Sequence, residues 1–397
     1  MKMLVILLAA ACALAYPQDN TLSPQLLEEI FGTPATQRPP NPNRLEDIMV
    51  SPTTVATTYT DKNGDSCKCV PYYLCDGNDN GIYVTNGSVT GWGQLDIRFG
   101  EDECQESVEK CCKGIRAEED VLTVRPPVAR GCGYRNKNGI DVSITGGTGE
   151  EAQFGEFPWV VAILNGDSGE YGGVGVLIHP QVVMTGAHVA LKFKKILIRA
   201  GEWDTQTVKE RLKSQEVLVE KMVIREDFHP KSLRNDMALL LLQHPVTLDA
   251  HINVACLPDQ DEDFDTAKSC FANGWGKDVF GQKGRYAVIL KKVEVNMVPH
   301  ATCARLMRTT RLGQRFVLHD SFVCAGGEGK DTCQGDGGAP LVCPIGGDRY
   351  KLSGLVAWGI GCNQRDVPAA YVRVAKFRTW VDGVMRSWLL PTDGYQI

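Results

Sequence analysis

The chain has 397 residues, of which 43% are hydrophobic and 23% charged, and its formal net charge is −6. This length exceeds what one hydrophobic core usually serves, so we expect two folded units of unequal size. The slightly acidic balance gives no general basis for binding nucleic acid or an acidic membrane, although it leaves room for local basic patches.

The first residues have the pattern of a secretory signal peptide. A short charged start, Met1–Met3, precedes the apolar run Leu4–Ala10, and Ala13–Ala15 supplies a small-x-small cleavage site before Tyr16. The apolar run is too short to cross a membrane, and no later run reaches about 18 uninterrupted apolar residues. We therefore expect residues 1–15 to be removed and the mature protein to be soluble and extracellular.

Cysteine usage agrees with that compartment. The chain has 15 cysteines, and loss of Cys12 with the signal leaves 14. An even number in an oxidising compartment predicts seven disulfides, and the alternative is a set of reduced cysteines in a cytosolic protein.

Residues 16–66 are rich in Pro, Thr and Asn and show no sustained apolar periodicity, with Pro39–Pro42 near their middle. This composition predicts an extended or disordered segment. Within Leu22–Phe31 one or two helical turns can form, so a docking element is the alternative to a solvated tail there.

Residues 67–112 form a compact cysteine module, whose members are Cys67, Cys69, Cys75, Cys104, Cys111 and Cys112. So short a segment cannot bury enough apolar surface alone, and disulfides must supply the stability. Spacing by itself leaves the pairing open. The stretch between Cys75 and Cys104 contains the sequon Asn86-Gly87-Ser88, which predicts N-glycosylation at Asn86 in an exposed loop.

Residues 113–143 form a linker that Pro126 and Pro127 stiffen. A regulatory cut needs an exposed bond after a basic residue, and Arg116 and Arg130 offer two such bonds. We favour Arg98 in the preceding module, because it is the only basic residue between the third and fourth cysteines.

From residue 144 to residue 397 short β-branched and aromatic runs alternate with Gly, Asn and Asp turns. Val217–Ile224 and Ala287–Val295 are examples, and the pattern predicts an all-β domain. One amphipathic helix is expected near the end, from about Ala375 to Leu390.

Six motifs in this domain resemble, in order, those of the trypsin-like serine proteases. They are Ile144-Thr145-Gly146-Gly147, Phe157-Pro158-Trp159, Thr185-Gly186-Ala187-His188, Asn235-Asp236-Met237-Ala238-Leu239-Leu240, Gly335-Asp336-Gly337-Gly338-Ala339-Pro340-Leu341 and Val356-Ala357-Trp358-Gly359. The resemblance implies a chymotrypsin-like fold of two six-stranded antiparallel β-barrels, with the site between them.

The main departure is at the nucleophile. The family motif has serine where this chain has Gly337, so the former base His188 and its orienting carboxylate Asp236 have no hydroxyl to activate. No Ser, Thr or Cys lies between Cys333 and Cys343, which argues against another nucleophile. We predict a protease fold without protease activity, since losing the nucleophile costs about 10⁶ in kcat. His188 and Asp236 are then structural relics or part of a ligand-binding site.

The resemblance also implies a primary substrate pocket lined by Asp331, Gly359 and Ala369. Family members with an aspartate at the first of these positions accept Lys or Arg. Ala369 replaces a glycine that keeps the pocket open, so its methyl group should narrow the pocket.

Two further departures concern activation and cross-linking. Ser143 precedes Ile144, where a trypsin-type activator needs Arg or Lys, and without a free Ile144 amine Asp336 has no buried ammonium to pair with. Family members also bridge the histidine loop with two cysteines, and the matching positions here are Gly173 and Val189.

The cysteine module resembles the clip domain of arthropod proteases, in the version of non-catalytic members, through the segment Cys67–Cys75. That likeness pairs the first cysteine with the fifth, the second with the fourth and the third with the sixth. With the pairing of the trypsin-like family, the implied bridges are Cys67–Cys111, Cys69–Cys104, Cys75–Cys112, Cys132–Cys256, Cys270–Cys343, Cys303–Cys324 and Cys333–Cys362. Two of them would hold together the fragments of a cut at Arg98.

Glu202 and Asp204 lie in a segment that resembles the calcium loop of some family members. Calcium takes six or more oxygens, so backbone carbonyls and water would have to complete a site built on two carboxylates. The alternative is an exposed acidic loop, and no other cofactor is expected.

Taken together, these features resemble the clip-domain serine protease homologues over about residues 67–390. The resemblance implies a secreted haemolymph glycoprotein of arthropod innate immunity, which assists an activating clip-domain serine protease in prophenoloxidase activation and melanisation. A cut at Arg98 is expected to expose a surface for self-association or partner binding. The alternatives are a pattern-recognition or adhesion protein that binds microbial surfaces, and an active serine-type peptidase.

Overall fold

Every described residue belongs to one compact unit, which lies within residues 56–397. The computed structural model describes residues 58–60, 66–71, 81–83, 93–96, 109–112, 114–116, 131–140, 142–145, 149–205, 210, 212–277, 286–328, 336–361 and 365–397. The expected signal peptide, Asn86, Arg98, Arg130 and Asp331 lie outside these ranges. Across the described ranges, no helix has the length and apolar character needed to cross a membrane.

The first barrel is closed by six antiparallel strands, as expected from the sequence. They are β8 (Val160–Asn165), β9 (Tyr171–His179), β10 (Val182–Thr185), β11 (Ile196–Ala200), β12 (Gln215–Ile224) and β13 (Ala238–Leu242), in the order β10-β13-β12-β11-β8-β9. β11 alternates buried and half-buried residues, whereas all five residues of β13 are buried. β13 is therefore covered on both faces, which explains its run of leucines.

The second β-structure is a sheet of seven strands, where the sequence predicted six. They are β14 (Cys270–Gly274), β15 (Lys291–Val295), β16 (Met297–Val298), β17 (Phe322–Ala325), β18 (Pro340–Gly346), β19 (Arg349–Trp358) and β20 (Ala369–Arg373), in the order β15-β14-β18-β19-β20-β17-β16. The extra strand arises because one chain segment is interrupted at Asn296, which separates β15 from β16. These halves lie at opposite edges of the sheet, so the segment curls the sheet toward a barrel.

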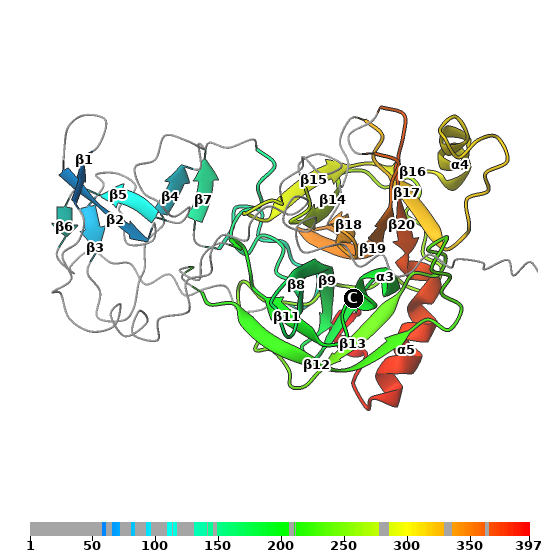
Figure 1. Ribbon diagram of the computed structural model, residues 1–397, viewed down its shortest axis with the longest axis horizontal. Helices are drawn as coiled ribbons and strands as arrows, with labels where there is room; N and C mark the ends of the chain where they lie inside the picture. The colour runs from blue at the N-terminus through cyan, green and yellow to red at the C-terminus, as the bar shows by residue number, and fades with distance from the viewer. Residues whose placement is uncertain are drawn as a thin grey trace, which may run out of the picture. The chain divides into compact units, whose positions relative to one another are not determined.

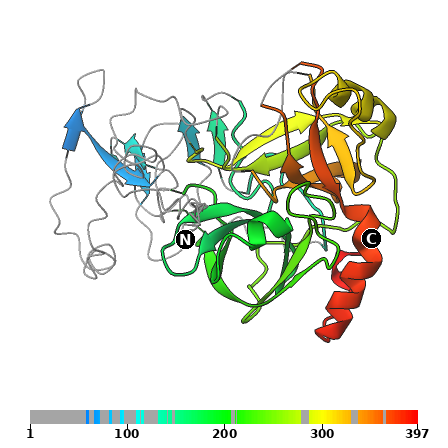
Figure 2. The same cartoon turned by 45° about the vertical axis from the view of Figure 1, so that its right-hand side comes forward.

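Helices cover the ends of the two β-structures. They are α3 (Ala187–Ala190), α4 (His300–Arg308), α5 (Arg378–Ser387) and the 3₁₀ turns η3 (Val374–Phe377) and η4 (Asp393–Tyr395). The expected terminal helix is thus split into η3 and α5. α5 buries Val381, Val384 and Met385, and Figure 2 shows it alongside both β-structures.

The cysteine module consists of short paired strands. β1 (Thr58–Thr60) pairs with β2 (Ser66–Pro71), and β2 pairs with β5 (Glu109–Cys112). β1 lies within the segment that was expected to be extended or disordered, and its Thr-Tyr-Thr sequence suits an edge strand. The module therefore begins before Cys67.

Two parallel pairs complete the described strands of Figure 1. β3 (Gly81–Tyr83) pairs with β6 (Gly114–Arg116), and β4 (Gly93–Asp96) pairs with β7 (Val142–Thr145). The second pair aligns Leu95 with Ile144, so the expected mature amino terminus stands inside a strand.

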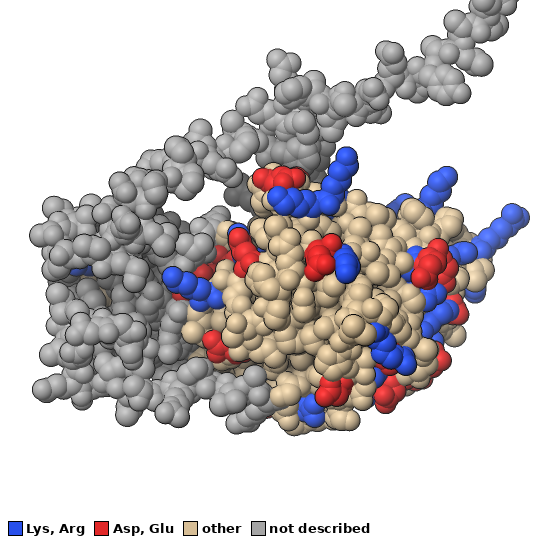
Figure 3. All heavy atoms as spheres, turned by 90° about the horizontal axis from the view of Figure 1, so that it is seen from below, with Lys and Arg blue, Asp and Glu red and all other residues tan. Residues whose placement is uncertain are grey.

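Charged side chains of both signs are interspersed over the face seen in Figure 3. This distribution agrees with the nearly balanced composition.

Candidate functional site

The structure brings His188 and Asp236 together between the two β-structures. His188 belongs to α3, which follows β10, and Asp236 comes shortly before β13. His188 Nδ1 lies 2.5 Å from Asp236 Oδ2, and the His188 backbone N–H donates to Asp236 Oδ1 at 2.8 Å. The Asp236 side chain is fully buried, whereas that of His188 is 21% exposed. A base oriented by a carboxylate is therefore preserved.

Asp236 is positioned by a backbone conformation that sequence reasoning missed. The preceding Asn235 has a left-handed φ of 56°, which asparagine tolerates better than most residues. Its N–H donates to the hydroxyl of Ser321 at 3.2 Å, and its side-chain amide donates to the Asp227 carbonyl at 3.1 Å. Ser321 directly precedes β17, so its hydrogen bond with Asn235 fixes the loop to the seven-stranded sheet.

Gly337 faces the base with no side chain. A Cβ built on Gly337 would lie 2.6 Å from His188 Nε2 and 3.2 Å from Val189 Cγ2. Real Cβ atoms essentially never approach a neighbour below 3.0 Å, so His188 occupies the room that a side chain at 337 would need. The Gly337 carbonyl accepts a hydrogen bond from the Val174 N–H at 3.0 Å, which fixes this backbone position.

The two positions of the missing histidine-loop bridge are neighbours in space. A Cβ on Gly173 would lie 2.9 Å from Val189 Cγ1 and 2.9 Å from the Gly337 carbonyl oxygen. Val189 is fully buried. Its isopropyl group therefore fills the space between α3 and the Gly337 turn by packing, where the family has a covalent link.

Asp336 is buried beside two glycines. Its Oδ1 accepts a hydrogen bond from the Gly276 N–H at 2.8 Å. A Cβ on Gly274 or Gly276 would lie 2.1 or 2.3 Å from a carboxylate oxygen, so this side chain needs glycine at both positions. Burial, and then the negative charge of Asp336, raise the pKa of the nearby Tyr171 well above its usual value.

The residues expected to line the primary pocket are only partly described. Gly359 is exposed directly after β19, and Ala369 is 2% exposed at the start of β20, which pairs with β19. Trp358 packs edge-on against Phe316 and Phe322, at ring-centroid distances of 6.1 and 5.8 Å. Asp331 is outside the described residues, so the pocket floor remains an expectation.

Four of the seven expected disulfides are present in the described part of the chain. They are Cys67–Cys111, Cys132–Cys256, Cys270–Cys343 and Cys303–Cys324. Cys69 and Cys112 are also disulfide-bonded, and their expected partners lie outside the described residues, as do Cys333 and Cys362. Cys132–Cys256 anchors the linker at residue 132 to the first barrel region. Cys67–Cys111 joins β2 to β5, Cys270–Cys343 joins β14 to β18, and Cys303–Cys324 joins α4 to β17.

Glu202 and Asp204 do not form an exposed loop, which corrects one of the alternatives. They are 6% and 0% exposed, because Trp203 between them is buried and donates its indole N–H to the Ala152 carbonyl at 2.9 Å. Arg199 compensates the first carboxylate through a 3.0 Å contact between Nη1 and Glu202 Oε2.

Glu210 joins this cluster and was missed from the sequence. Its Oε1 accepts from the Asp204 N–H at 3.2 Å, and burial together with the charge of Glu202 raises its pKa to about 8. Within the ranges that the structure describes, no three acidic, His or Cys side chains are grouped closely enough to hold a metal ion. The described donors thus make a carboxyl pair rather than a complete calcium cage.

Comparisons with known proteins cover both parts of the chain. The family profile described as Trypsin matches residues 147–381, and the profile described as Serine protease Clip domain PPAF-2 matches residues 56–113.

Individual relatives match two thirds of the chain or more. The chain is 50% identical over 285 residues to phenoloxidase-activating factor 2 of Galleria mellonella, which covers 67% of this chain and 94% of that protein. It is 38% identical to inactive CLIP domain-containing serine protease A8 of Anopheles gambiae, over 81% of this chain and 89% of that one. It is 36% identical to inactive CLIP domain-containing serine protease A3 of Aedes aegypti, over 81% and 68%.

Proposed function

The chain belongs to the clip-domain serine protease homologues, and from this premise we propose that it has no peptidase activity and serves as a protein cofactor in prophenoloxidase activation. The observation that carries the first half is the geometry at residue 337. His188 Nε2 lies only 2.6 Å from where a Cβ at that position would be, and glycine offers no hydroxyl. General-base activation therefore has nothing to act on.

The cofactor role rests on what the fold retains without its chemistry. The hydrogen-bonded His188–Asp236 pair and the tightly packed turn at Gly337 preserve the local arrangement of a protease site. Such a surface can bind a protease or its substrate without cutting either. One relative named above is called a phenoloxidase-activating factor, which supports prophenoloxidase and its activating clip-domain protease as the partners.

Secretion into the haemolymph belongs to the same proposal. It rests on the signal pattern of residues 1–15 and on the disulfides observed, since such bridges persist in oxidising compartments.

Reconstitution from purified components tests the function directly. Prophenoloxidase and its activating clip-domain protease are incubated with and without this protein, and phenoloxidase activity is measured alongside the cleavage of the zymogen. We expect active phenoloxidase to rise when the protein is added, while the protein alone cleaves neither prophenoloxidase nor Arg and Lys substrates. Equal phenoloxidase activity with and without the protein contradicts the cofactor role.

A further inference from the structure

The segment from Val295 to His319 contains no acidic residue, in a chain whose net charge is −6. It includes α4 and the loop that follows it, and it carries four arginines, Arg305, Arg308, Arg311 and Arg315. We call these four residues the arginine surface. No feature of the vestigial protease site uses them.

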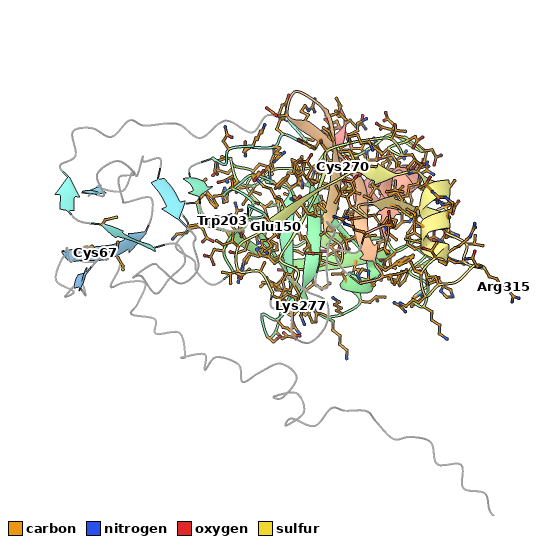
Figure 4. All side chains as sticks on the ribbon, turned by 90° about the horizontal axis from the view of Figure 1, so that it is seen from above. Cys67, Glu150, Trp203, Cys270, Lys277 and Arg315 are labelled. Carbon is orange, nitrogen blue, oxygen red and sulfur yellow. A yellow bond between two sulfur atoms is a disulfide. The ribbon has the colours of Figure 1, made fainter. Side chains whose placement is uncertain are left out.

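The arginine surface is uncompensated. Elsewhere in the described structure Arg135, Arg199, Arg225 and Arg378 each form an ion pair with an acidic side chain. Among the described residues, none of the four arginines of this surface has such a partner. Arg305, Arg311 and Arg315 are exposed, and Figure 4 shows the Arg315 side chain extending away from the body.

The scaffold beneath the arginine surface is well fixed. The disulfide Cys303–Cys324 joins α4 to β17. Arg308 Nε donates to the Phe316 carbonyl at 2.9 Å, which folds the loop back onto the helix, and the Phe316 ring packs against Trp358. Arg305 and Arg308 are three positions apart, so they project from one side of the last helical turn. Binding here would order little additional chain.

The chemistry of this surface selects an anion. Guanidinium groups are planar and weakly hydrated, and they bind sulfate, phosphate and carboxylate groups with paired hydrogen bonds. Arg305 and Arg308 are three positions apart in α4, and like charges at this spacing repel each other in the free protein. A ligand that brings several negative charges along a line would relieve that repulsion at each position.

We propose that the arginine surface binds a linear anionic polysaccharide. A protein partner would need an apolar interface core, and Val317, 71% exposed, is the single large exposed hydrophobic residue described in this segment. Single-stranded nucleic acid favours exposed aromatic rings for stacking, whereas Phe316 is engaged with Trp358. A charged sugar chain requires neither feature. The proposal is independent of the role in prophenoloxidase activation.

The test measures binding of the full-length protein to heparin, used as the probe, at several salt concentrations. Counterion release makes the affinity fall linearly with salt on logarithmic axes, with a slope that grows with the number of charge contacts. The variant R305Q/R311Q/R315Q should bind heparin roughly tenfold more weakly or worse near 0.15 M salt and show a shallower slope. Arg308 is left intact because it holds the loop.

The matched control removes the same total charge elsewhere. Lys137, Lys194 and Lys213 are exposed and lie outside the segment, so K137Q/K194Q/K213Q changes the net charge equally. We expect this variant to bind heparin within about twofold of the wild type, since screening confines charge effects to about 10 Å at 0.1 M salt. Melting temperatures of both variants verify that they fold.

Three outcomes would overturn the proposal. One is equal heparin affinity of the wild type and the arginine variant. Another is an equal loss in the lysine control, which would make binding a matter of total charge. The third is tighter binding of duplex DNA than of heparin at matched charge concentration, which would assign the surface to nucleic acid.

Discussion

At the scale of single residues, the His188 ring lies so close to Gly337 that it occupies part of the space that a side chain at position 337 would need. His188 Nε2 lies 2.6 Å from where a Cβ at 337 would stand. A serine placed there would have to displace the ring that is meant to activate it. The inactivity that we propose thus rests on the packing of these two residues as well as on the absence of a hydroxyl at position 337.

Restoring the hydroxyl should therefore fail to restore the enzyme. For Gly337→Ser we expect kcat/KM on Arg and Lys p-nitroanilides below about one hundredth of a trypsin-like value, since a displacement near 1 Å costs on the order of 10²-fold. Ser143 and Ala369 add to the loss if activation and the pocket are altered as the sequence predicts. Trypsin-like rates, with stoichiometric labelling by an active-site phosphonate, would contradict this account.

Glu210 gives a pH-dependent prediction. Its pKa in the folded protein is about 8, against an ordinary value of 4.5, so the protonated form is favoured by folding. The contribution of protonated Glu210 to the free energy of unfolding is fully present below pH 4.5 and is lost as the pH rises through 8. Glu210→Gln keeps a neutral donor, and we expect its melting temperature, measured with EDTA, to gain on the wild type between pH 6 and pH 9.

Calcium provides the second arm of that experiment. A cation beside Glu202 and Glu210 would take over the role of the proton, so calcium should raise the melting temperature of the wild type at pH 9 more than that of Glu210→Gln. A melting temperature of Glu210→Gln that tracks the wild type at every pH would show that the carboxyl pair does not control stability.

At the scale of elements, α5 contains a position where the sequence is not optimal for its structure. Gly383 lies within the helix, and a Cβ built on it meets nothing within 4 Å. Glycine inside a helix costs about 0.5–1 kcal/mol relative to alanine. Gly383→Ala should therefore raise the free energy of unfolding by about that amount in denaturant titrations.

Gly338→Ala is the opposite case and serves as the contrast. Gly338 has a left-handed φ of 77°, and its Cβ would lie 2.2 Å from Thr185 Oγ1 and 2.4 Å from the Val174 carbonyl oxygen. Because that oxygen belongs to the backbone, the neighbour cannot simply rotate away, and we expect a loss of about 1–3 kcal/mol. Equal effects of the two substitutions would show that local space does not decide the outcome.

Some elements follow directly from local sequence and others do not. Val217–Ile224 is rich in β-branched residues, as expected of a strand, and it forms most of β12. The break between β15 and β16 at Asn296 could not be predicted from the local sequence, because it results from the curvature of the whole sheet. β1 was missed because three residues gain their stability from pairing with β2.

The site divides in the same way. His188, Asp236 and Gly337 were recognisable from motifs, and the fold brings them together. Ser321 was not, because it contacts Asn235 from 86 residues further along the chain. Glu210 was not, because its hydrogen bond with the Asp204 N–H, six residues earlier, belongs to no motif that the sequence presents. Sequence motifs identify residues whose type and spacing are typical of a catalytic site. Contacts that arise from tertiary packing can be identified only in the folded structure.

At the scale of the whole molecule, the disulfides determine how the chain responds to a cut. Four disulfides are observed, and the three others are expected to involve cysteines outside the described residues. Together these disulfides use all 14 cysteines of the mature chain. Titration of thiols in denaturant without reductant should therefore read near zero. One reactive cysteine per chain would overturn the pairing scheme.

The strand pairing and the disulfides also distinguish the three candidate cleavage sites. Arg116 ends β6, where it is paired with Tyr83, and a bond at a strand end suits a protease less than one in an open loop. Arg98 follows β4 by two positions, and β4 pairs with β7 around Ile144. A cut after Arg98 would leave β4 at a new chain end while the expected bridges Cys69–Cys104 and Cys75–Cys112 keep the fragments joined.

We predict that this cut frees β4 from β7 and creates the surface for self-association or partner binding. The activating protease should produce a new amino terminus at Phe99, two fragments on reducing gels, one band on non-reducing gels and a larger native assembly. Arg98→Ala should abolish all of these and the gain in phenoloxidase activity, whereas Arg116→Ala and Arg130→Ala should behave as the wild type. In the Arg98→Ala protein, β4 remains continuous with the chain that follows it. If this protein still assembles and still promotes prophenoloxidase activation, the switch lies at another bond.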